Sequence, residues 1–220
     1  MKESSRDLLV KGAARMGVAL TDDAVSLFGI LLSLLQTWGS RINLTTRLGE
    51  QEIIVHHFLD SLAGAGVLSG TPAARVIDLG AGAGFPSFPL KFALPGLRIT
   101  LAESIRKKVA FCSEVIRATG CAEIEALCAR AEDLARQKSH REAYDWAVSR
   151  ALGSAAAVLR LALPLLAPGG RALIYKGAPT TQELDELGRA CGAIGAAWSL
   201  SEVEIPFLEA RRSLIIVTTA

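Results

Sequence analysis

Cysteine is scarce in this sequence, with four residues in 220, at Cys112, Cys121, Cys128 and Cys191. No two of them form a CxxC pair, and no histidine stands near them at the spacing of metal ligands. The sequence therefore predicts neither a disulfide framework nor a metal site. We expect these cysteines to be small core residues in a reducing compartment.

Long apolar runs and a strong charge of either sign are also missing. The best candidate for a membrane span, residues 25–35, is too short and is interrupted by Ser26, Gly29 and Ser33. The N-terminus carries acids and no apolar core, which disfavours a secretory signal, so we expect a cytoplasmic protein. Because the net charge is only +2, a nucleic-acid partner would have to be bound by local clusters of cations.

The pattern that is present divides the chain in two. Residues 1–68 carry apolar side chains at helical spacing, and Thr21 is a predicted helix N-cap. Residues 43–46 predict a turn or cap, and a further helix is expected over 51–65. We predict an N-terminal helical subdomain over 1–68 and a second domain over 69–220.

Short β-rich runs alternate with helical segments in the second part of the chain. This alternation favours a doubly wound α/β fold, in which helices cover both faces of a mostly parallel sheet. The last two runs are close enough to form a hairpin, so we expect seven strands with the last antiparallel. The expected strands are 75–79, 98–103, 123–127, 145–149, 171–176, 198–205 and 213–218, and the expected helices are 86–93, 105–119, 131–138, 154–166 and 181–192.

A glycine-rich loop follows the first expected strand. Asp78 is followed by alternating Gly80, Gly82 and Gly84, and then by Phe85. Glycine permits positive φ angles and lets a ligand approach the backbone closely. A strand, a glycine loop and a helix in succession predict a nucleotide-type site at the carboxyl edge of the sheet.

The spacing of the glycines discriminates among ligands. The dinucleotide pattern GxGxxG is absent, because Phe85 or Ser87 stands at its last position, and no P-loop occurs. The remaining pattern, Asp-x-Gly-x-Gly-x-Gly, resembles motif I of class I methyltransferases. Glu103, which ends the second strand, suits the ribose hydroxyls of an adenosyl group as an acceptor. Glu132, after the third strand, is a weaker candidate for the adenine side.

Further motifs follow in order along the chain: Asn43-Leu-Thr, His56-His57-Phe58-Leu59-Asp60-Ser61-Leu62, the glycine loop through Ser87, Glu103-Ser104 with Lys107-Lys108, Arg130-Ala131-Glu132, Ser149-Arg150-Ala151 and Tyr175-Lys176-Gly177. With them, the chain from about residue 36 to residue 218 resembles the bacterial small-subunit ribosomal RNA guanine-N7 methyltransferases, also called the glucose-inhibited division protein B family.

This resemblance implies a Rossmann-like enzyme that transfers a methyl group from S-adenosylmethionine to N7 of one guanine in 16S ribosomal RNA and leaves S-adenosylhomocysteine. The partner would be 16S ribosomal RNA or a precursor of the small ribosomal subunit, with no membrane, and we expect a monomer. The cofactor contacts expected from the loop and the resemblance are Asp78, Gly80, Gly82, Gly84, Phe85, Glu103, Ser104, Ile105, Ala131, Glu132 and Arg150.

Guanine N7 carries an in-plane lone pair and no proton, so its methylation needs no general base. The sequence fits, since it has neither an Asn/Asp-Pro-Pro-Tyr/Phe tetrad nor a Pro-Cys pair. Arg150 and Lys176, at two strand ends, are the predicted catalytic residues. We place Arg150 on the open edge of the sheet for O6 or phosphate contacts, with Lys176 holding a phosphate beside it. His56 and His57 predict helix packing or an RNA contact.

Two alternatives stay open: a class I methyltransferase of a small molecule or protein, and a non-catalytic RNA- or nucleotide-binding module with this fold. RNA binding that weakens steeply with salt would argue against the first, and methyl transfer would exclude the second. The basic residues expected at RNA phosphates are Arg106, Lys107, Lys108, Arg136, Lys138, Arg141, Arg211 and Arg212.

Overall fold

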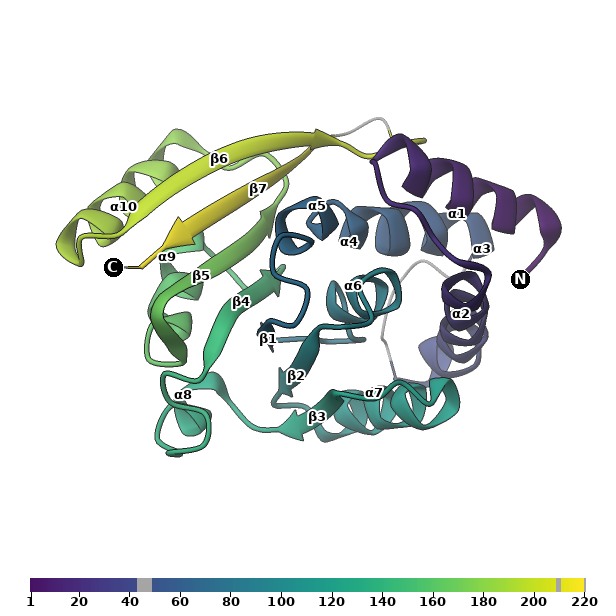
Figure 1. Ribbon diagram of the computed structural model, residues 1–220, viewed down its shortest axis with the longest axis horizontal. Helices are drawn as coiled ribbons and strands as arrows, with labels where there is room; N and C mark the ends of the chain where they lie inside the picture. The colour runs from purple at the N-terminus through teal and green to yellow at the C-terminus, as the bar shows by residue number, and fades with distance from the viewer. Residues whose placement is uncertain (43–48, 209–210, 220) are drawn as a thin grey trace.

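A single seven-stranded sheet runs through the computed structural model, which describes residues 1–42, 49–208 and 211–219. Its strand order is β3-β2-β1-β4-β5-β7-β6, and only the last strand, β7, runs antiparallel to its neighbours (Figure 1). The predicted doubly wound, mostly parallel sheet with a closing hairpin is therefore confirmed. The strands are β1 (Arg75–Leu79), β2 (Arg98–Glu103), β3 (Ile124–Cys128), β4 (Tyr144–Arg150), β5 (Leu166–Lys176), β6 (Ala197–Glu204) and β7 (Arg211–Thr218).

Helices cover both faces of this sheet (Figure 1). The chain begins with a run of helices, and the later ones alternate with the strands. They are α1 (Glu3–Arg15), α2 (Asp22–Ile42), α3 (Glu50–Ile53), the π-helix η1 (Ile54–Leu59), α4 (Asp60–Leu62), α5 (Ala65–Leu68), α6 (Ser87–Ala93), α7 (Arg106–Thr119), α8 (Ala131–Leu134), α9 (Ala155–Ala162) and α10 (Thr181–Ala193). No helix among the described residues is long and apolar enough to span a bilayer.

Alternation along the strands divides the core into two layers, because successive side chains point to opposite faces. Val76 packs in the layer under α1, α2 and α4 to α7, whereas its neighbour Ile77 packs in the layer under α8, α9 and α10. Both faces of the central strands are buried, as expected for a parallel sheet covered on both sides. The run Val76-Ile77-Asp78-Leu79 is therefore almost continuously apolar, and Asp78 is its one polar member.

The N-terminal helices belong to the same core as one face of the sheet. Leu9 of α1 and Phe28 of α2 lie in one buried cluster with Val76 of β1 and Trp146 of β4. The boundary predicted at residue 68 falls between α5 and β1, and the division into two domains stays a prediction. The predicted cap at Thr21 is confirmed, since its hydroxyl accepts from the Ala24 amide at 3.1 Å. The turn predicted over residues 43–46 lies outside the described residues.

Three predicted helices differ in the structure. The helix expected over 131–138 ends as α8 at Leu134. The helix expected over 51–65 contains the π-helical turn η1, which interrupts its regular hydrogen bonding, and it ends as α4 at Leu62. The helix expected over 154–166 ends at Ala162, and Leu166 already belongs to β5. Pro164 explains the early end, because proline has no backbone N–H with which to continue the helical hydrogen bonds. The chain can then turn back into the sheet two residues later.

The contact between α5 and the sheet leaves no room at Gly64. A Cβ atom added there would lie 2.1 Å from the Tyr175 hydroxyl and 2.8 Å from a Leu173 methyl group. We therefore expect Gly64→Ala to lower the free energy of unfolding by about 1–3 kcal/mol in urea titrations, because the packed neighbours must move. Gly66→Ala is the matched control, since a Cβ atom there meets nothing within 4 Å and helical glycine is unfavourable. Equal stability of the two variants would contradict this packing.

Candidate functional site

The loops at the carboxyl ends of β1 to β4 enclose a cavity of about 380 Å³, which we call the edge pocket. Its volume is within the usual range of small-molecule sites. Five residues predicted to bind a cofactor line it together: Gly80, Glu103, Ser104, Ala131 and Glu132. Ala151 and Leu152, which follow β4, complete the wall beside Gly80.

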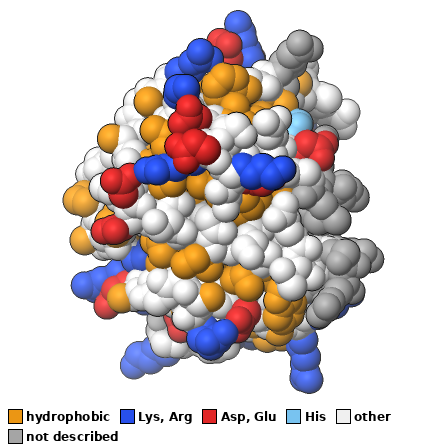
Figure 2. Space-filling view, turned by 90° about the vertical axis from the view of Figure 1, so that its right-hand side faces the viewer, with side chains coloured by type: hydrophobic (Ala, Val, Ile, Leu, Met, Phe, Trp, Pro, Cys, Tyr) orange, Lys and Arg blue, Asp and Glu red, His pale blue; other side chains and the backbone are white. Residues whose placement is uncertain are grey.

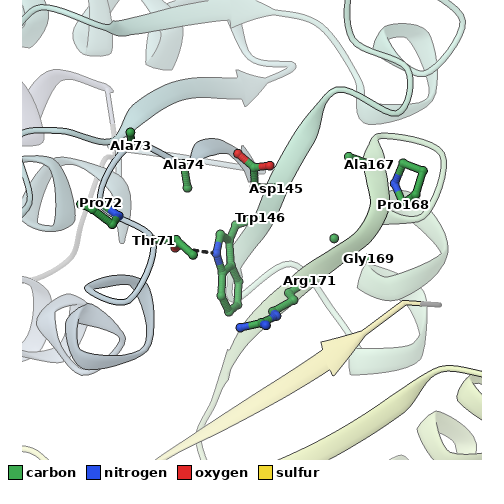
Figure 3. Close-up of a pocket in the computed structure, with 11 residues that line it drawn as sticks. Thr71, Pro72, Ala73, Ala74, Asp145, Trp146, Ala167, Pro168, Gly169 and Arg171 are labelled. Carbon is green, nitrogen blue, oxygen red and sulfur yellow. Dashed lines mark hydrogen bonds between the residues drawn. The ribbon is translucent and has the colours of Figure 1, made fainter.

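A second cavity, of about 430 Å³, lies at the opposite edge of the sheet (Figure 3). There the indole nitrogen of the buried Trp146 donates to the Thr71 hydroxyl at 3.0 Å, and the Arg171 guanidinium lies 5.4 Å from the centre of the indole ring. None of the predicted site residues lines this cavity. Ligands of doubly wound sheets bind at the carboxyl ends of the strands, so the edge pocket is the candidate site.

The glycine loop has the backbone that its sequence predicts. Gly80, Gly82 and Gly84 have φ angles of 70°, 60° and 80°, in the region that glycine occupies without strain. The amides of Gly80 and Ala81 donate to the Ala102 carbonyl, which ties the loop to β2. A Cβ atom at Gly82 would have no neighbour closer than 3.9 Å. The loop is therefore held firmly and still leaves open space at Gly82.

Glu103 ends β2 and joins the loop to the start of α7. Its two carboxylate oxygens accept from the Gly82 amide at 3.0 Å and from the Ile105 amide at 2.9 Å. The Lys108 ammonium lies 3.9 Å from the same carboxylate. The side chain is almost buried, yet each carboxylate oxygen can accept a second hydrogen bond. Glu103 therefore shapes the pocket and also offers it an acceptor.

Asp78 is a buried acid without a partner. Neither of its carboxylate oxygens has a hydrogen-bond partner among the described residues, and the buried hydroxyl of Ser87 has none either. Burial raises the pKa of Asp78 to about 7, although the Ser87 hydroxyl beside it and the nearby charge of Arg150 lower it. Ser87 lies close to the carboxyl group without forming a well-directed hydrogen bond to it. Buried polar groups are nearly always satisfied, so this pair is a candidate functional position.

Arg150 lies in a network and not on an open edge, so that expectation is wrong. Its guanidinium donates to the Asp60 carboxylate at 2.8 Å and contacts His57 Nδ1 at 3.2 Å. It also lies 5.0 Å from the centre of the Phe85 ring, on which the His57 imidazole is stacked. Only 15% of the Arg150 side chain is exposed, because the π-helical turn and α4 cover this end of β4. His57 thus has the packing role that the sequence allows.

Asp60 is the residue of this network that sequence reasoning missed. It is 1% exposed, and its second oxygen accepts from the Arg212 guanidinium of β7 at 2.5 Å. The available signal was an acid inside an otherwise apolar helical segment, between Phe58-Leu59 and Leu62. Acids are rarely buried unless they are paired, so such a residue indicates a buried ion pair.

Lys176 does not lie beside Arg150, and that expectation is also wrong. Arg150 pairs with Tyr175 in the parallel register of β4 and β5, so Lys176 points to the other face of the sheet. Its ammonium donates to the Glu183 carboxylate and to the Gly153 carbonyl, each at 2.8 Å. A phosphate would have to displace Glu183, and the catalytic role predicted for Lys176 has no support from this placement.

Most of the cations expected at RNA phosphates have acidic neighbours. Five of them make ion pairs within the chain: Lys108 with Glu103, Arg136 with Asp133, Arg141 with Glu142, Arg211 with Glu202, and Arg212 with Asp60. Figure 2 shows cations and acids interspersed among the described side chains of the face around the N-terminal helices. Arg106 and Lys107 are exposed at the start of α7, next to the edge pocket that Lys108 lines.

Comparison with known proteins identifies the family to which the chain belongs. The family model GidB, described as rRNA small subunit methyltransferase G, matches residues 25–215. A Ribosomal RNA small subunit methyltransferase G from Alkaliphilus oremlandii is 32% identical over 213 residues, which cover 96% of this chain and 89% of that protein. A protein of the same name from Roseiflexus castenholzii is 37% identical over 215 residues, or 97% and 92% of the two chains.

Solved structures give the same fold. The O-methyltransferase from Bacillus cereus in complex with SAH aligns with a TM-score of 0.61 at 14% identity, over 87% of this chain and 91% of that one. P. horikoshii TYW2 in complex with MeSAdo aligns with a TM-score of 0.58 at 15% identity, over 74% and 62% of the two chains. At these identities the alignments show the class I methyltransferase fold alone.

The buried Asp78 should make the stability of the protein depend on pH. Its pKa is about 7 in the folded chain against an ordinary 3.8, so its ionisation opposes folding increasingly from about pH 4 to pH 7. Asn at this position cannot ionise, and the unfolding free energy of Asp78→Asn relative to wild type should rise over that range by up to about 4 kcal/mol. Urea unfolding at pH 5 and pH 8 measures this difference. Asp185→Asn, on the exposed side of α10, controls for the loss of one carboxylate, and a difference that does not change with pH would contradict the assignment.

Proposed function

The chain belongs to the rRNA small subunit methyltransferase G family of S-adenosylmethionine-dependent enzymes, and we propose that its methyl acceptor is N7 of one guanine in 16S ribosomal RNA. The observation that carries this proposal is the combination of an edge pocket suited to the cofactor with neighbouring acids that are unsuited to remove a proton. The first part supports S-adenosylmethionine as the methyl donor, and the second favours an acceptor atom that carries no proton.

The residues present fit S-adenosylmethionine. Glu103 would accept from the ribose hydroxyls, and Ala131 with Glu132 would border the adenine, since all three line the edge pocket. The open space at Gly82 would admit the methionine part, and its ammonium group would supply the partner that Asp78 lacks. When bound, the cofactor provides an electrophilic methyl group on a sulfonium.

Asp60 and Tyr175, which pack near Arg150, are not suited to accept a proton, and Asp78, whose pKa is about 7, is fully buried and would be paired with the ammonium group of the cofactor. The Asp60 carboxylate is neutralised by two guanidinium groups, so it is a poor proton acceptor. Burial raises the pKa of Tyr175, and its hydroxyl donates to the Ser61 carbonyl at 2.8 Å. An acceptor that must lose a proton would find no assistance from these groups, whereas guanine N7 has no proton to lose. Positioning of the two reactants is then the main task of the enzyme.

A cation beside the acceptor guanine must also tolerate the product, because guanine methylated at N7 is positively charged. The guanidinium of Arg150 is paired with Asp60 and lies over the Phe85 ring, so its charge is largely compensated. A guanidinium held in this way can donate to O6 or to a phosphate without opposing the charge that develops at N7. We therefore keep Arg150 as the proposed substrate-positioning residue of the site.

Cofactor binding should depend on the open backbone at Gly82. Gly82→Ala places a methyl group in the space that the ligand needs, and we expect the affinity for S-adenosylhomocysteine in calorimetry to fall by about tenfold or more. Gly120→Ala is the matched control: its φ of 63° is close to the 60° of Gly82, and a Cβ atom there also meets no neighbour. Both variants should lose about 1 kcal/mol of stability, because alanine is strained at positive φ. Equal affinities in the two variants would contradict the placement of the cofactor.

The acceptor atom can be tested directly by replacing the target guanine with 7-deazaguanine in the RNA. We expect RNA binding to be nearly unchanged and methyl transfer to be abolished, since only the nucleophilic nitrogen is lost. The single-turnover rate on normal RNA should be almost flat from about pH 6.5 to 8.5, because no side chain must accept a proton. Methyl transfer to the deaza substrate, measured by nucleoside analysis, would mean that another atom is modified.

A further inference from the structure

Leu152 is an exposed apolar side chain in the wall of the edge pocket. It is 38% exposed and follows β4 by two residues. It leans over the glycine loop, since a Cβ atom at Gly80 would lie 2.6 Å from Leu152 Cδ1. Exposed leucines are common on surfaces, but one that lines a concave site offers apolar area for a ligand to cover.

The backbone on both sides of Leu152 is unusual. Ala151 has a φ of 62° and Gly153 a φ of 120°, so Leu152 lies between two residues in the region of positive φ. For Ala151, which has a side chain, this conformation costs on the order of 1 kcal/mol. A strained residue persists only where its surroundings hold it, and the contacts of residues 150–155 show what holds this segment.

The segment is fixed at both ends. At its start, Arg150 is paired with the buried Asp60. At its end, the Lys176 ammonium donates to the Gly153 carbonyl at 2.8 Å, and Glu183 accepts from the Ala155 amide at 2.9 Å. Lys176 and Glu183 also pair with each other at 2.8 Å, with 21% and 16% of their side chains exposed. One ion pair on the α10 face of the sheet thus anchors the residues that follow Leu152.

We propose that Leu152 is a further cofactor-contacting residue and that Lys176 and Glu183 are positioning residues that hold it against the glycine loop. This inference rests on the proposed cofactor and concerns its adenosyl half. Leu152 borders the same cavity as Glu103 and Ala131, the acceptor for the ribose and the neighbour of the adenine. The open space for the methionine part lies at Gly82, where Leu152 is not among the near neighbours.

Two probes separate the halves of the cofactor: S-adenosylhomocysteine, and methylthioadenosine, which lacks the amino-acid part. In calorimetry, Leu152→Ala should weaken both by the same factor, about 5- to 30-fold, as expected for lost contact area of one leucine. Leu200→Ala is the matched control, because Leu200 is 39% exposed on the edge strand β6, and it should leave both affinities unchanged. Leu152→Ser serves as a second variant, and unfolding without ligand checks that each variant is folded.

The positioning role is tested by charge and by rescue. Lys176→Gln removes the ion pair and should weaken both probes by a smaller factor, about 3- to 10-fold, whereas Lys176→Arg should recover most of the affinity. Combining Lys176→Gln with Leu152→Ala should cost less than the product of the two separate effects, because both act through the same contact. A merely structural lysine would give independent effects and no dependence on the leucine.

The outcomes distinguish this inference from the proposed function. If wild-type protein binds neither probe, the proposed cofactor itself fails. If wild type binds both probes and Leu152→Ala binds each of them with wild-type affinity, the contact between Leu152 and the cofactor is excluded. A loss for S-adenosylhomocysteine alone would place Leu152 at the methionine part and overturn the adenosyl assignment. If the loss of affinity in the double variant equals the product of the losses in Lys176→Gln and Leu152→Ala, the positioning role is overturned.

Discussion

The buried carboxylate of Asp60 is the constraint on which the arrangement of the site depends. It is 1% exposed and accepts from Arg150 of β4 at 2.8 Å and from Arg212 of β7 at 2.5 Å. Transfer of a carboxylate from water into a protein interior costs several kcal/mol unless close charges compensate it. Two guanidinium groups from separate strands supply that compensation, so α4 is held at one position on the sheet. A few residues away, the Tyr175 hydroxyl donates to the Ser61 carbonyl and packs closely against Gly64, which also fixes this helical segment on the sheet.

The position of Asp60 also determines where the guanidinium of Arg150 lies. Because Asp60 holds Arg150, the guanidinium lies against Phe85 at the end of the glycine loop, next to the stacked His57. The same arginine is the last residue of β4, so its position fixes where the segment with Leu152 begins. The helical N-terminal part of the chain thereby holds the proposed substrate-positioning residue, although none of its described residues lines the edge pocket. An enzyme that acts mainly by positioning its reactants requires side chains that are held rigidly, as Arg150 is held by Asp60.

The sequence predicts the sheet well, because short β-rich runs that alternate with helical segments are local signals. β1 and β2 have the predicted bounds, and the glycine loop has the predicted positive φ angles. Local signals of this kind do not predict to which face of the sheet the side chains of Arg150 and Lys176 point. Both residues end strands, and their relative orientation depends on the register of β4 and β5, which shifts between Tyr144 and Trp146. The pairing of Asp60 with Arg212, 152 residues apart, likewise has no local signal. The π-helical turn is also a product of packing and not of local propensity.

The edge pocket and the adjoining end of β1 concentrate features that oppose folding. Asp78 of β1 is buried with no hydrogen-bond partner among the described residues, Ala151 adopts a positive φ, and Leu152 exposes apolar area to the pocket. Each of these is unfavourable in the protein alone, and the rest of the carboxyl edge shows the opposite behaviour, since Glu103, Arg150 and Lys176 all have close partners. A ligand with a cationic group at one end and a flat apolar ring at the other would relieve two of the three at once: the ammonium would pair with Asp78, and the ring would cover Leu152. Binding energy obtained in this way is available because the folded protein leaves these groups unsatisfied.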